Sequence, residues 1–189
     1  MKRMVLFLGA CAIGAGVVAD VAPASGQGDA EAVPIYGVKL PRGYRDWGFI
    51  SVARVGAPVN DMRAKLGNDV AIRAYREGKI PFPDGTIIAR LAYNQATSEE
   101  GNAVLGAAAR KQGLSPEAVQ KLLSESFVAG PATNVQFMVK DSKKYASTGG
   151  WGFAQFNDGK PADAALLKAC FLCHQPAQAQ DFVYTRYAP

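Results

Sequence analysis

The clearest alternation of apolar and polar positions lies in residues 82–95, FPDGTIIARLAYNQ. The turn signal PDG at 83–85 is followed by a run with the period of two that is typical of a strand. Ile88 and Arg90 share one face of this strand. The opposite face carries Ile87, Ala89, Leu91 and Tyr93. The pattern therefore predicts a strand whose apolar face is opposed by a face that includes a charged residue.

Shorter segments rich in β-branched and aromatic residues predict further strands. They are residues 47–53, 134–140 and 152–156. Helices are predicted from apolar periodicity and from N-capping residues. They are residues 70–76 after Asn68 or Asp69, 97–112, 115–128 after the cap Ser115, and a helical turn at 163–168. Because strands and short helices follow no regular βαβ alternation, the predicted fold class is α+β, a predominantly antiparallel β-sheet with added helices.

The length of 189 residues fits one domain preceded by a targeting segment. A basic start, an apolar run and an A-x-A processing signal ending at Ala24 predict a signal peptide over residues 1–24, and hence a periplasmic or otherwise exported protein. Cys11 lies in a lipobox-like LGAC sequence, which offers lipidation as an alternative. Residues 25–42 are predicted to be an irregular leader, and residues 43–189 the folded domain.

The formal net charge is +5, and basic and acidic residues are interspersed along the chain. No cluster of Lys and Arg with interleaved aromatic residues occurs, so nucleic-acid binding has no support. We also expect no membrane attachment once the signal peptide is removed. The mild positive charge suits docking to an acidic redox partner.

The candidate chemistry lies near the C-terminus in CFLCH, where Cys170 and Cys173 are followed directly by His174. Cys-x-x-Cys serves as a dithiol couple, as half of a zinc site, or as the attachment point of a covalent haem. Zinc needs about four ligands, whereas the chain has three cysteines, one of them Cys11, and a single histidine. A thioredoxin-like couple belongs at the start of a helix after a strand, but here the pair follows a helical turn.

A histidine directly after the second cysteine favours haem, because the two thiols bond the vinyl groups and His174 ligates the iron. We therefore predict one covalent haem c per chain, held by Cys170, Cys173 and His174. Met62, in the polar stretch VNDMRAK, and Met138, in a predicted strand, are interpreted as packing residues rather than iron ligands. The iron is then five-coordinate, which favours binding of small molecules over electron relay alone.

Five motifs accompany CFLCH at 170–174. They are YRDW at 44–47, FPDGT at 82–86, VKDSKKYA at 139–146, WGF at 151–153 and DFVYTRY at 181–187. With these motifs, nearly all of residues 44–189 resembles the cytochrome P460 family, which includes the β-sheet cytochromes c′ (cytochrome c′-β). The helical stretch 97–128 resembles an insertion relative to shorter members. The resemblance implies an antiparallel β fold with helices, one haem per chain, a homodimer, and binding of nitric oxide at an open iron.

The P460 enzymes of this family oxidise hydroxylamine and carry a lysine bonded to the haem edge, six residues after the Asp of F-x-D-G-T. Counted from Asp84, that position is Arg90. A guanidinium stays protonated and is a poor nucleophile, so we predict no lysine cross-link and an ordinary c-haem spectrum. Arg90 is instead a candidate to pair with a haem propionate or to donate hydrogen bonds to a bound distal ligand.

An oxidase of hydroxylamine also benefits from a base near the iron. Residues 164–167, just before Cys170, are apolar, so a carboxylate is missing there unless Asp163 reaches the site. Four aromatic residues are candidates for an apolar distal wall, although core packing is the expected role of each. They are Phe82, Phe137, Phe153 and Phe156.

The main hypothesis is a cytochrome c′-β-like protein whose five-coordinate iron binds nitric oxide or similar small ligands. One alternative is a P460-type oxidoreductase that acts on hydroxylamine or nitric oxide. The other is a simple electron-transfer cytochrome with Met62 or Met138 on the iron.

Overall fold

The computed structural model of the chain describes residues 36–188. The predicted signal peptide 1–24, with Cys11, and residues 25–35 of the predicted leader lie outside the described residues. No helix within residues 36–188 is both long enough and apolar enough to cross a membrane.

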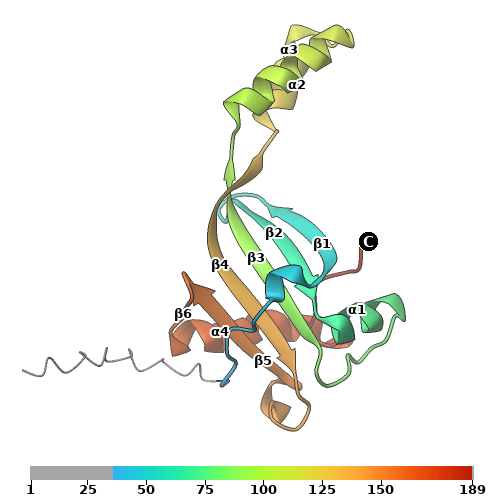
Figure 1. Cartoon of the computed structure of the whole chain (residues 1–189), viewed down its shortest axis with the longest axis vertical. Helices are drawn as coiled ribbons and strands as arrows, with labels where there is room; N and C mark the ends of the chain where they lie inside the picture. The colour runs from blue at the N-terminus through green and yellow to red at the C-terminus, as the bar shows by residue number, and fades with distance from the viewer. Residues whose placement is uncertain (1–35, 189) are drawn as a thin grey trace, which may run out of the picture. The chain divides into compact units, whose positions relative to one another are not determined.

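Six strands form one antiparallel sheet in which each strand pairs with the next along the chain (Figure 1). The strands are β1 (Gly48–Val55), β2 (Asp61–Gly67), β3 (Ile87–Ala96), β4 (Val128–Lys140), β5 (Trp151–Asn157) and β6 (Lys160–Pro161). The helices are α1 (Asp69–Arg76), α2 (Glu99–Lys111), α3 (Pro116–Ser124) and α4 (Ala164–His174). The predicted α+β class with an antiparallel sheet is confirmed.

The predicted helix starts are confirmed by side chains that accept hydrogen bonds from the first turn. Asn68 caps α1 and Ser115 caps α3, with Pro116 at the first helical position of α3. Asp163, predicted to begin a helical turn, caps a full helix that includes the cysteine motif. Short polar side chains at these positions satisfy N–H groups that have no partner within the helix.

Strands β2 and β6 were not predicted from the sequence, and the boundary between α3 and β4 differs from the predicted one. In residues 61–67 charged side chains occupy every second position, which obscured the strand pattern. The helix predicted over 115–128 ends at Ser124, and β4 begins at Val128 rather than at residue 134. The additional part of β4 pairs with the end of β3, and this extended ribbon carries α2 and α3 at its far end (Figure 1).

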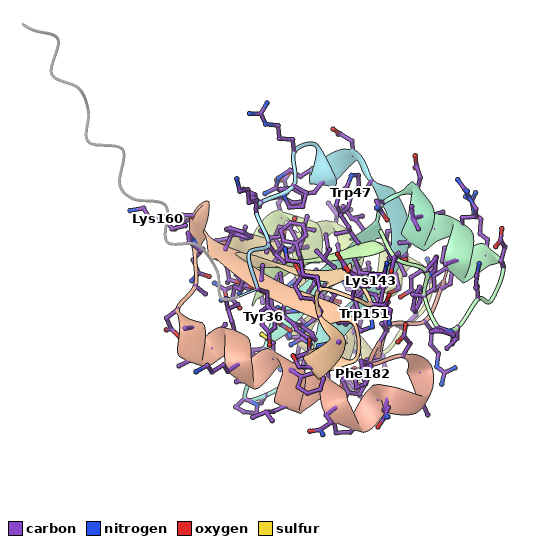
Figure 2. All side chains as sticks on the ribbon, turned by 90° about the horizontal axis from the view of Figure 1, so that it is seen from below. Tyr36, Trp47, Lys143, Trp151, Lys160 and Phe182 are labelled. Carbon is purple, nitrogen blue, oxygen red and sulfur yellow. The ribbon has the colours of Figure 1, made fainter. Side chains whose placement is uncertain are left out.

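Two cores lie on the two sides of the sheet. The closed face is the side covered by residues 36–47, and its buried residues are Val38, Ala89, Leu91, Phe137, Tyr145, Ala154 and Phe156. The open face is the side toward α1 and α4, and its buried residues are Ile50, Ala71, Ile72, Ala74, Phe82, Ile88, Met138, Trp151, Phe153 and Val183. Trp47 packs on the first core and Phe182 on the second, on opposite sides of the sheet in Figure 2.

Candidate haem site

Helix α4 places the three residues of the cysteine motif on one side of the helix. Positions i, i+3 and i+4 of an α-helix share a face, and Cys170, Cys173 and His174 have this spacing. The helix begins at the Asp163 cap, whose carboxylate accepts from the Leu166 N–H at 2.8 Å. Leu167 is completely buried and anchors the helix to the body of the domain. The two thiols and the imidazole are therefore presented together by a rigid element.

This side of α4 borders a cavity of about 460 Å³ whose far wall is the open face of the sheet. Two rows of side chains in cross-strand register form that wall. The polar row is Lys65, Arg90, Gln136 and Gln155, and the apolar row is Ile88, Met138 and Phe153. The cavity thus has a thiol and imidazole side, an apolar part and a cationic part.

The His174 ring is oriented by a hydrogen bond that it donates to the protein backbone. Its Nδ1 lies 2.7 Å from the carbonyl oxygen of Phe182, so Nδ1 carries the proton and donates it to this carbonyl. Burial lowers the pKa of His174, which favours the neutral ring. Its Nε2 lone pair is then available to a metal, as in other histidines held by a carbonyl at Nδ1.

The two cysteines are free thiols in the structure. Cys170 is half-buried and Cys173 is exposed, and both border the cavity. Burial, and then the charge of Cys173, raise the pKa of Cys170. Among residues 36–188 no three His, Cys, Asp or Glu side chains lie close enough together to hold a metal ion. A tetrahedral zinc site therefore gains no support from this part of the chain.

Arg90 lies in the cavity wall but most of its guanidinium is already engaged. Its Nη2 contacts Asp61 Oδ2 at 2.5 Å, and its Nη1 donates to Gln136 Oε1 at 2.8 Å. Asp61 also binds the Nε of Arg63 through both carboxylate oxygens at 2.9 Å. The Nε of Arg90 is buried without a partner in the described residues. A buried unpaired donor beside a cavity is consistent with a bound group that carries acceptors.

The residues around Arg90 were not predicted as site residues. Asp61, Arg63 and Lys65 belong to β2, and Arg63 and Lys65 border the cavity. A usable signal exists in the sequence, because charged residues at 61, 63 and 65 alternate with the less polar Met62, Ala64 and Leu66. Asp163, the carboxylate considered from the sequence, is exposed, caps α4 and does not border the cavity.

Some of the methionines and phenylalanines considered from the sequence border the cavity, and others do not. Met138 borders the cavity, whereas Met62 alternates with the cavity-lining Arg63 and points to the other side of β2. Phe153 borders the cavity and its ring centre lies 5.3 Å from that of His174. Phe137 also borders the cavity, but its ring packs in the closed-face core. Core packing is confirmed for all four, Phe82, Phe137, Phe153 and Phe156.

The residues at the cavity fit a c-type haem. Two thiols and one imidazole lie on one side, an apolar surface suits a porphyrin ring, and cations suit the propionates. A comparison with protein families matches residues 41–185 to cytochrome P460. A search of curated proteins found no match for the chain.

Proposed function

The chain belongs to the cytochrome P460 family of haem proteins, and on this basis we propose that it is a periplasmic monohaem cytochrome c that binds nitric oxide or similar small ligands. In this proposal Cys170 and Cys173 hold the haem through thioether bonds, and the Nε2 of His174 ligates the iron. The haem supplies an iron with one open coordination position. The protein would hold that iron and orient its histidine.

One observation carries the proposal. The two thiols and the imidazole lie on the same side of α4 and border one cavity, and the Nδ1 of His174 is occupied by the Phe182 carbonyl. Only Nε2 is then left for the iron. The family match implies haem, and this geometry favours covalent attachment at these three residues.

Coordination on the other side of the iron decides between ligand binding and electron transfer. His174 is the only histidine of the chain, so a second histidine ligand is excluded. Met62 points away from the cavity, but Met138 borders it. Met138 is also packed in the open-face core, 9% exposed, which favours packing as its role. An electron-transfer cytochrome with Met138 on the iron is the second candidate function.

Oxidation of hydroxylamine, the third candidate, has less support from the cavity. The ionisable side chains that the sheet contributes to its wall are cations, Arg63, Lys65 and Arg90. The adjacent carboxylate, Asp61, already binds both arginines, so it is poorly placed to accept a proton from a substrate. The resemblance places the cross-linking lysine at position 90, where this chain has an arginine. We therefore propose a haem without a lysine cross-link.

The remaining parts of the proposal concern location and partners. The predicted signal peptide favours the periplasm, where covalent haem attachment is expected. The family resemblance favours a homodimer, and the positive net charge favours an acidic redox partner. The mass of the purified protein in solution tests whether it forms a homodimer.

The proposed function is tested by absorption spectra of the haem-loaded protein. They are recorded for the ferric and the dithionite-reduced protein, each with and without nitric oxide. We expect an ordinary five-coordinate ferrous c-haem spectrum that changes when the gas is added. A methionine-to-iron band in the ferric spectrum, lost in Met138→Leu, would establish the electron-transfer candidate instead. A strongly red-shifted ferrous Soret band would indicate a modified haem and support hydroxylamine oxidation.

A further inference from the structure

A buried ion pair joins the end of β4 to the segment that follows the cysteine motif. Lys140 is 6% exposed and Asp181 is 7% exposed, and Lys140 Nζ lies 2.6 Å from Asp181 Oδ1. The same Nζ donates to the Gly149 carbonyl at 3.1 Å and lies 4.9 Å from the centre of the Trp151 ring. Both charges are removed from water, which is costly unless their partners are held in good geometry. Such pairs add little net stability compared with apolar residues, so stability alone does not account for this pair.

The second oxygen of Asp181 fixes this segment to another part of the chain. Oδ2 accepts from the backbone N–H of Phe82 at 2.8 Å. One carboxylate therefore ties residue 181 both to β4 and to the turn before β3. Asp181 and the next residue, Phe182, have φ values of 51° and 64°. Two consecutive non-glycine residues with positive φ are unfavourable and persist only where surrounding contacts hold them.

The residue held in this way is the hydrogen-bond partner of His174. The Phe182 carbonyl accepts from His174 Nδ1 at 2.7 Å. The Phe182 ring packs directly over Gly149, where a Cβ atom would overlap the ring. Gly149 has φ of 67°, which glycine adopts without strain. Lys140 thus binds both the residue before Phe182 and the residue beneath its ring.

We propose that the Lys140–Asp181 ion pair is a positioning device for the haem-ligating histidine. It holds the Phe182 carbonyl against Nδ1 of His174, and thereby sets the ring tautomer and the electron-donor strength of Nε2. The inference rests on the proposed haem function. A carbonyl that accepts from Nδ1–H makes an imidazole a stronger donor, which favours the ferric state and lowers the reduction potential.

The test uses Lys140→Met, Asp181→Asn and the double variant of both in the haem-loaded protein. Met has nearly the length of Lys, and Asn keeps an acceptor for the Phe82 N–H. The double variant leaves no unpaired buried charge, so it is expected to fold even where a single variant does not. Matched controls are Lys144→Met, which removes a lysine that lies over Tyr145 but is exposed, and Asp84→Asn, which removes an exposed carboxylate bound to Ser142.

Resonance Raman spectroscopy of the ferrous protein and redox titration supply the readouts. We expect the iron–histidine stretching frequency to fall and the midpoint potential to rise in each pair variant, and neither to change in the controls. A folded double variant with the wild-type frequency and potential would show that the pair only stabilises the fold, and would overturn the proposal.

A third readout separates this inference from the haem assignment. The ¹⁵N shifts of the His174 ring report its tautomer in the haem-free protein, where no iron occupies Nε2. We expect one tautomer, protonated at Nδ1, in the wild type, and a mixture in the double variant. Failure of the wild type to bind haem would overturn the proposed function, whereas an unchanged tautomer in the double variant would overturn the positioning role.

Discussion

Phe137 and Met138 are neighbours in β4, yet they face very different environments. Phe137 is 1% exposed, and its ring contacts Tyr44, Trp47 and Phe156 on the closed face. Met138 faces the other side of the sheet and borders the cavity. The same strand thus completes a core on one side and forms the wall of a binding site on the other, because successive side chains of a strand point to opposite faces.

The difference lies in what the neighbouring strands add to each face. On the closed face the buried residues of the core are apolar and aromatic, and residues 36–47 cover them. On the open face the strands add the polar row of Lys65, Arg90, Gln136 and Gln155. Covering such a row with apolar side chains would leave buried polar groups unpaired. The open face is therefore suited to a ligand that is partly apolar and partly anionic, as a haem is.

The largest effect is expected from removing both thiols on the open side. In Cys170→Ala/Cys173→Ala we predict complete loss of covalently bound haem, because within residues 36–188 no other cysteine borders the cavity. Mass spectrometry of the denatured protein measures the bound haem. The closed face should be unaffected, so the far-ultraviolet circular dichroism of the haem-free variant should match that of the haem-free wild type. Haem that remains covalently attached in the double variant would contradict attachment through Cys170 and Cys173.

Truncation of the two neighbouring residues in β4 tests the comparison directly. Phe137→Ala should lower the free energy of unfolding by about 3–5 kcal/mol, since it opens a cavity in a filled core. Met138→Ala should cost less, about 2 kcal/mol, because the Met138 side chain is 9% exposed and less enclosed than the Phe137 ring in the closed-face core. Urea unfolding of the haem-free variants measures both. An equal or larger cost at Met138 would mean that the two faces are packed equally well.

A smaller effect is expected within the polar part of the cavity wall. Arg90→Met removes one of the two arginines that bind Asp61 and should cost about 1–3 kcal/mol, because Asp61 is buried. Arg63→Met should cost less than about 1 kcal/mol, because the Arg63 side chain is 27% exposed and solvent screens its pairing. Urea unfolding of both variants measures the difference. The reverse order would show that Arg63 is the main partner of Asp61.

The smallest effect concerns the cover of the closed face. Tyr145 donates from its hydroxyl to the Tyr36 carbonyl at 2.9 Å, which fixes the start of the segment 36–47. Tyr145→Phe should cost about 0.5–1.5 kcal/mol, the usual net value of one hydrogen bond. Tyr93→Phe is the control, because the Tyr93 side chain faces the same core without a hydroxyl hydrogen bond in the described residues. Thermal unfolding compares the two variants. Equal midpoint temperatures would show that the Tyr145 hydroxyl does not stabilise the segment 36–47.

Local patterns predicted several of these features correctly. The alternation of residues 87–93 assigned the two faces of β3, and the caps Asn68 and Ser115 marked two helix starts. The charged residues at 61, 63 and 65 obscured β2, although Met62, Ala64 and Leu66 alternate with them. Asp61 pairs with Arg90 of β3 instead of facing solvent alone. Asp163 was considered as a base near the iron, but local hydrogen bonding makes it a helix cap.

The sequence by itself determined most of the helices and strands and the candidate groups for binding haem. Period-two alternation, capping residues and the Cys-x-x-Cys-His spacing depend on contacts within a few residues, which are readable along the chain. Only the tertiary structure decided which charges meet. Asp61 with Arg90, Lys140 with Asp181, and the Phe182 carbonyl with His174 are brought together by strand register and by chain reversal after α4. Such contacts join distant segments, so no local periodicity encodes them.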